Sequence, residues 1–209
     1  MRRTLGIAIL AGALGIAGPA FAQMGAGGGS YDDYTGGLAN HGTYDPRMHE
    51  SKVWNDPETV AEDLRHKGRC EEAIPILRNL ADSADGYEIS QYNLGLCLLD
   101  LAAADPQHPP AERKEGADYI LLAANSGFGK AQAAAVGIYL DGNGVDTDPV
   151  EAEKWALVYH DNGMRIALGL HDLPPEVMSR LNASLTPPKR AEAKARAFSW
   201  TPSTNGPGN

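Results

Sequence analysis

Two segments of the chain repeat each other at a spacing of 36 residues, and this repeat restricts the possible folds more than any other feature of the sequence. Residues 125–127 and 161–163 each end a segment whose apolar residues have helical spacing, and Tyr119 and Trp155 occupy equivalent positions inside those segments. Helix–turn–helix units that recur with periods of about 20–50 residues are typical of proteins built from stacked repeats. The sequence therefore predicts an all-α fold made of helical hairpins in series.

Turn and capping residues divide the chain from residue 56 onward into predicted helices. Asp56 and Pro57 favour a helix start, Gly68 favours its end, and residues 148–149 mark another start. The expected helices cover 57–67, 70–83, 88–101, 111–126, 130–140 and 149–161, followed by 164–170, 176–185 and 187–200. Because terminal repeats need a covering element, the last two helices are expected to cover the final hairpin. The covering side chains would be Val177, Leu181, Leu185, Ala191, Ala195, Phe198 and Trp200.

The first 22 residues have the features of a cleavable secretory signal. Two arginines near the start are followed by an apolar stretch at 5–17, and residues 20–22 place small side chains at the cleavage site, so the mature chain is expected to begin at Gln23. A membrane anchor is the alternative, but glycines and Pro19 interrupt an uncharged stretch of only 19 residues, whereas an anchor needs about 20 predominantly apolar ones. We therefore expect a periplasmic or secreted protein, with no membrane insertion after signal cleavage.

Two further segments lack the apolar residues needed for a packed core. Residues 23–55 have the Gly-rich composition of a flexible linker, and residues 201–209 have that of a disordered tail. Such segments bury too little apolar surface to offset the entropy of ordering. The folded part is thus expected to consist of a repeat region at 56–170 and capping helices at 171–200.

Charge and motifs argue against several classes of function. The formal net charge of −9 provides no basic field for nucleic acid or an anionic membrane. The six histidines do not have metal-ligand spacing, and the nucleophile and phosphate-binding motifs of common enzymes are missing. We therefore expect no catalytic activity, no metal and no cofactor.

The two cysteines, Cys70 and Cys97, are 27 positions apart. In an exported protein such a pair favours a disulfide over a metal site. The turn between the two helices centres near residue 85, so the position opposite residue 70 in an antiparallel hairpin is close to 99. The two Cβ atoms should then lie about 4 Å apart. Two buried free thiols are the alternative.

The last of three repeat units, residues 128–163, resembles the Sel-one-like repeat, a relative of the tetratricopeptide repeat. The resemblance depends on Ala131, Gln132, Tyr139, the turn at 141–145, Asp148, Ala152, Trp155 and Gly163. Ala135 and Val136 depart from the Leu-Gly pair of the family, which the preceding unit keeps as Leu94 and Gly95. The first unit, from Asp56, is closer to a plain tetratricopeptide repeat. This resemblance implies a right-handed α-solenoid of about three hairpins with a C-terminal capping helix.

The resemblance also implies a binding surface. In related solenoids the first helix of each hairpin lines a concave groove, and family members commonly act as adaptors. By position, this groove would hold Glu58, Glu62, Arg65, Tyr92, Asn93, Leu96, Asp100, Lys130, Ala133 and Gly137. We therefore expect an adaptor or scaffold of the bacterial cell envelope whose partner is another protein. Two alternatives stay open, which are weak β-lactam binding or hydrolysis and a secreted factor that acts on a host.

Overall fold

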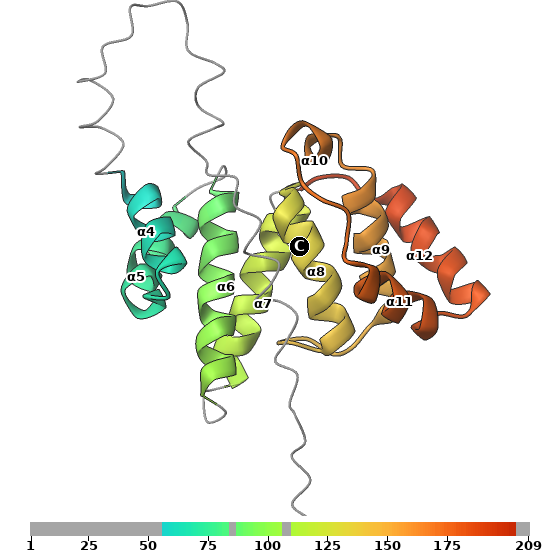
Figure 1. The fold of residues 1–209 in the computed structure, drawn as a ribbon, viewed down its shortest axis with the longest axis horizontal. Coiled ribbons are helices and arrows are strands. Elements are labelled where there is room, and N and C mark those ends of the chain that lie inside the picture. The colour runs from blue at the N-terminus through green and yellow to red at the C-terminus, as the bar shows by residue number, and fades with distance from the viewer. Residues whose placement is uncertain (1–55, 84–86, 106–109, 204–209) are drawn as a thin grey trace, which may run out of the picture. The chain divides into compact units, whose positions relative to one another are not determined.

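The computed structural model describes residues 56–83, 87–105 and 110–203. Nine helices and no strand occur in these ranges, which confirms the predicted all-α class (Figure 1). The helices are α4 (Pro57–His66), α5 (Cys70–Ala81), α6 (Glu88–Ala104), α7 (Pro110–Asn125), α8 (Gly129–Asp141), α9 (Pro149–His160), α10 (Gly163–Ala167), α11 (Pro175–Ser184) and α12 (Pro187–Ser199).

Some predictions fall outside the described residues. These are the signal peptide at 1–22, the linker at 23–55, and the part of the 201–209 tail after residue 203. Of the helices that the structure describes, none combines the length and the apolar character needed to cross a membrane.

The helix boundaries lie within a few residues of the predicted ones, and polar side chains cap the first turns of α4, α9 and α10. The Asp56 carboxylate accepts a hydrogen bond from the backbone N–H of Thr59, 3.1 Å away, and so caps α4. Asp148 caps α9 in the same way, with its Oδ1 2.9 Å from the backbone nitrogen of Val150. Each cap satisfies a backbone donor that the helix itself leaves unpaired.

Each helix from α4 to α8 packs against the next one along the chain. Side chains also connect helices two apart in sequence, since Arg78 of α5 forms an ion pair with Glu115 of α7. Near this pair, the Tyr119 hydroxyl of α7 donates to the Asp82 carboxylate at the end of α5 over 2.7 Å. Both pairs join residues that are 37 positions apart. The spacing of these contacts is therefore close to the spacing of the sequence repeat.

The predicted disulfide between Cys70 and Cys97 is confirmed, with the two Cα atoms 5.1 Å apart. Cys70 is the first residue of α5, and Cys97 lies within α6. Both are buried in an apolar cluster with Ala61, Ala73, Leu77, Ala81, Leu94 and Leu98. The bond therefore fastens the α4–α5 pair to α6 from inside the core.

Two glycines allow α6 and α7 to approach closely where they cross. A Cβ atom added to Gly95 would lie 2.5 Å from the carbonyl oxygen of Gly116 and 2.5 Å from Cγ1 of Ile120. Both glycines are buried. Only a residue without a side chain fits this crossing without movement of the backbone.

Buried glutamines make equivalent hydrogen bonds in α6 and α8. Gln132 of α8 donates from its Nε2 to the carbonyl of Ala124 over 3.3 Å. Gln91 of α6, 41 positions earlier, donates to the carbonyl of Ala81 over 3.5 Å. Each glutamine thus donates a hydrogen bond to the end of the preceding described helix, Gln132 to α7 and Gln91 to α5.

The two glutamines differ in what their oxygen atoms accept. Asn162 donates from its Nδ2 to Oε1 of Gln132 over 2.8 Å, whereas Oε1 of Gln91 is buried without a partner. The residue 36 positions before Asn162 is Ser126, whose side chain is shorter and whose hydroxyl donates to the Leu122 carbonyl of its own helix. The earlier unit therefore lacks, at position 126, the amide donor that Asn162 provides in the later unit.

Replacing Ser126 by asparagine should stabilise the protein by about 1 kcal/mol, because the new amide supplies the donor that Gln91 lacks. Urea denaturation of Ser126→Asn and of the matched Ser126→Ala variant measures the effect. If the asparagine variant is no more stable than the alanine variant, positions 126 and 162 are not equivalent.

At the C-terminal end, α12 packs against α9 through an apolar contact and through ion pairs. Ala193 of α12 is buried in a cluster with Val150 of α9 and Leu185. Arg190 of α12 pairs with Glu153 over 2.9 Å, and Arg196 pairs with Glu151 over 2.5 Å. The Trp200 ring meets the Trp155 ring edge to face, with 5.9 Å between their centroids.

The predicted covering residues divide into two groups. Val177, Leu181 and Leu185 are buried, and Trp200 is half-buried, as expected. The prediction is wrong for Ala191, Ala195 and Phe198, which are exposed, Phe198 to 94%. The buried alanine of α12 is Ala193 instead.

Candidate functional site

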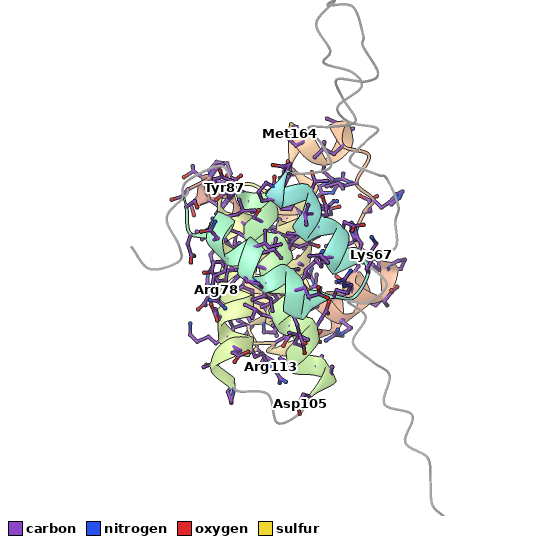
Figure 2. All side chains as sticks on the ribbon, turned by 90° about the vertical axis from the view of Figure 1, so that its left-hand side faces the viewer. Lys67, Arg78, Tyr87, Asp105, Arg113 and Met164 are labelled. Carbon is purple, nitrogen blue, oxygen red and sulfur yellow. A yellow bond between two sulfur atoms is a disulfide. The ribbon has the colours of Figure 1, made fainter. Side chains whose placement is uncertain are left out.

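The residues predicted to bind a partner lie on α4, α6 and α8, which alternate along the chain with α5, α7 and α9. α4 contacts α6 directly, and the Ser90 hydroxyl of α6 donates to the Glu58 carboxylate of α4 over 2.6 Å. Figure 2 places Lys67, at the end of α4, and Arg78 of α5 on opposite sides of the helices. We name one set of residues the α4–α6–α8 face: Glu62, Arg65, His66, Tyr92, Leu96, Asp100, Phe128 and Lys130.

Tyr92 and Phe128 connect α6 to the start of α8. Their ring centroids are 5.4 Å apart at an interplanar angle of 68°, an edge-to-face arrangement that aromatic pairs favour. Burial raises the pKa of the Tyr92 hydroxyl to about 12. Both side chains are half-buried, so part of each ring stays at the surface.

Arg65 differs from every other arginine that the structure describes, because it has no hydrogen-bonded oxygen. It is half-buried, and its Nε is buried without a partner. The others donate to carboxylate or carbonyl oxygens, and they are Arg69, Arg78, Arg113, Arg165, Arg180, Arg190 and Arg196. Buried polar groups are nearly always hydrogen-bonded, so an unpaired guanidinium nitrogen needs an explanation.

The charge of Arg65 acts on two residues of α6. Burial raises the pKa of both Tyr92 and Asp100, and the positive charge of Arg65 acts on both in the opposite direction. The two residues are about 12 Å apart along the helix axis, because an α-helix rises 1.5 Å per residue. The segment between them carries Asn93 and Leu96.

Asn93 belongs to this segment but is only 1% exposed. Neither its amide nitrogen nor its amide oxygen has a hydrogen-bond partner. Such a group costs about 1–3 kcal/mol when it is left unpaired. Asn93 therefore adds no exposed surface to the α4–α6–α8 face, in contrast to the expectation, but it adds an unsatisfied donor and acceptor beneath that face.

His66 and Lys130 extend the face where α4 ends and α8 begins. Burial lowers the pKa of His66, as do the charges of Arg65 and Lys130, while Glu62 and Asp63 act against this shift. Both His66 and Lys130 are exposed, and Lys130 forms no ion pair with the residues that the structure describes. Three basic side chains from two helices are thus neighbours.

Sequence reasoning missed Phe128, although a signal for it exists. Phe128 follows the helix-ending Gly127, and Met164 follows Gly163 at the same point of the next unit, 36 positions later. Met164 is 53% exposed and appears at the top of Figure 2. The remaining predicted residues of α8, Ala133 and Gly137, are half-buried.

The chemistry of the face suits noncovalent binding. Within 56–83, 87–105 and 110–203, no group of three or more His, Cys, Asp or Glu side chains is placed to hold a metal ion. The face offers two aromatic rings and two cations, Arg65 and Lys130, without an ion pair among the described residues. These groups can accommodate a polar chain that also carries apolar side chains.

Comparison with known proteins assigns no family to this chain. No family model matches the sequence, and no curated protein or solved structure matches it either. The resemblance to Sel-one-like repeats therefore remains a prediction from the residues quoted for it.

Proposed function

We propose that this chain is an exported Sel-one-like repeat protein that binds an extended segment of another protein on its α4–α6–α8 face. The observation that carries the proposal is the half-buried Arg65 on this face, which has no hydrogen-bonded oxygen among the described residues. An extended segment has free backbone C=O groups. These groups can accept hydrogen bonds from the guanidinium.

The contact pattern supports the repeat part of this proposal. The α5–α7 pairs at a separation of 37 residues and the two equivalent glutamines are expected of hairpins stacked in series. In such an array the first helices of successive hairpins lie on one side. Under the proposal, α4 to α9 form about three hairpins of a right-handed α-solenoid, and α11 and α12 cover its end.

The disulfide supports export, because disulfides persist in oxidising compartments and are rare in the cytosol. We therefore infer that the chain loses residues 1–22 as a signal peptide and acts in the periplasm or outside the cell. Its proposed role there is that of an adaptor or scaffold without catalytic activity of its own.

Site-specific photocrosslinking in the native envelope tests the binding face. A benzophenone amino acid at Leu96 or at Lys130 should capture the same species, which a gel reveals as one shifted band. The matched control position is Asn79, an exposed residue of α5 outside the face. The proposal fails if neither face position crosslinks, or if Asn79 captures that species equally well.

A further inference from the structure

Arg65 has the properties of one half of an incomplete ion pair. Its guanidinium is charged throughout the physiological pH range, and its planar fork of N–H donors matches a carboxylate. Among the described arginines it alone has no oxygen partner, and its Nε is already removed from solvent. Lys130 adds a second cation without an ion pair on the same face.

The carboxylates of the chain itself do not complete this pair. Glu62 lies one helical turn before Arg65, and Asp100 lies near it on α6, yet neither forms an ion pair in the described part of the chain. Burial raises the pKa of Asp100, and the positive charge of Arg65 acts against this shift without an ion pair between the two side chains. The N–H groups of Arg65 therefore stay open to a carboxylate from another molecule.

An apolar surface lies beside this charged region. Phe128 packs on Tyr92, and the next residue, Gly129, lies against Leu170, since a Cβ atom on Gly129 would be 3.1 Å from the Leu170 Cδ1. Tyr92, Phe128 and Leu170 are each half-buried. A ligand that reaches Arg65 along α6 therefore also meets the aromatic surface of Tyr92 and Phe128, and Leu170 lies beside the residue that follows Phe128.

The charge at Arg65 and the apolar surface of Tyr92 and Phe128 together indicate which kind of segment binds. The following inference rests on the proposed function. We infer that the bound segment is acidic, with an aspartate or glutamate that pairs with Arg65. A large apolar side chain a few residues away packs on Tyr92 and Phe128. The carboxylate completes the ion pair, and the backbone of the segment lies over the α6 stretch that contains Asn93.

Selection from a random linear peptide library on the immobilised full chain tests this inference. Enriched peptides should carry an acidic residue close to an aromatic or large aliphatic one. One such peptide is then synthesised with its acidic residue, and again with Glu→Gln or Asp→Asn at that position. The neutral peptide should bind the unmodified chain about tenfold more weakly, the loss typical of a charge-assisted hydrogen bond.

A double-mutant cycle assigns this difference to Arg65. The Arg65→Gln variant should bind both peptides equally, whereas Lys189→Gln, which removes an exposed cation of α12, should keep the full difference. Equal affinities of the two peptides for the unmodified chain overturn the inference whether or not a variant folds. If the acidic and neutral peptides differ in affinity for Arg65→Gln by as much as for the unmodified chain, the role of Arg65 is overturned.

The failures of the two proposals are distinguishable. If peptides are enriched without acidic residues, the acidic partner is wrong and binding of an extended segment stands. If no peptide is enriched at all, binding of an extended segment is itself contradicted, and the inference about its charge fails with it.

Discussion

Replacing Cys70 and Cys97 together by alanine should lower the free energy of unfolding by about 3–4 kcal/mol. The disulfide joins residues 27 positions apart, and cross-links of this length restrict the unfolded chain by roughly that amount. The loss should be largest around α4 and α5, because the bond cross-links the start of α5 to the interior of α6. Hydrogen exchange should show the amides of α4 and α5 opening first in the variant.

Denaturation with and without a thiol reductant provides the control. The reductant should lower the stability of the unmodified chain to that of the cysteine-free variant, and it should not affect the variant. Mass spectrometry of the non-reduced, exported protein tests the bond directly. Two alkylatable thiols would mean that the bond does not form, and this result would contradict the prediction.

Gly95→Ala should destabilise the chain by up to about 2 kcal/mol. Alanine is the better helix former by about 1 kcal/mol, but its methyl carbon would lie 2.5 Å from both the Gly116 carbonyl oxygen and the Ile120 side chain. Overpacking of this kind forces the backbones apart and commonly costs about 1–3 kcal/mol or more. The steric cost therefore exceeds the gain in helix propensity. Thermal and urea unfolding measure the net change.

Gly163→Ala is the matched control, because a Cβ atom at Gly163 meets nothing within 4 Å. Its stability should change by less than about 0.5 kcal/mol, as is usual for unconstrained surface positions. An equal effect of the two substitutions would mean that close contact between α6 and α7 is not what requires glycine at position 95.

The helices and the disulfide could be predicted because local chemistry determines them. Asp56 and Asp148 accept backbone hydrogen bonds in the first turns of α4 and α9, so their positions in the sequence mark the helix starts. The disulfide followed from counting outward from the turn between two helices. Both arguments need only residues that are near one another in the chain.

The exposed part of α6 could not be predicted in the same way. This helix is buried on most of its circumference by α4, α5 and α7, so apolar residues occur on several sides of it and their periodicity does not mark one surface. Position relative to a related fold placed Asn93 at the surface together with Tyr92, but the two side chains point about 100° apart around the helix. Tyr92 reaches the surface, and Asn93 lies beneath it.

The contact side of α12 was predicted wrongly for a different reason. From 191 to 197 every second residue is alanine and the residues between are charged. This alternation does not favour one side of a helix. Ala193 packs against Val150 of α9 and Leu185, and Arg190 and Arg196 on either side of it pair with carboxylates of α9. The partners of these arginines lie 37 and 45 positions away, and local patterns do not reveal them.

The two ends of the described chain are thus held by bonds that respond to different properties of the surrounding solution. A covalent sulfur–sulfur bond attaches α5 to α6, and it depends on the thiol redox potential but not on salt. At α12, dissolved ions screen the more exposed Arg196–Glu151 pair more than the Arg190–Glu153 pair, because Glu153 is buried. The apolar contact of Ala193 with Val150 and Leu185 does not depend on that screening. A reductant therefore removes a cross-link from the first helix pair, whereas salt leaves the last helix its apolar contact with α9.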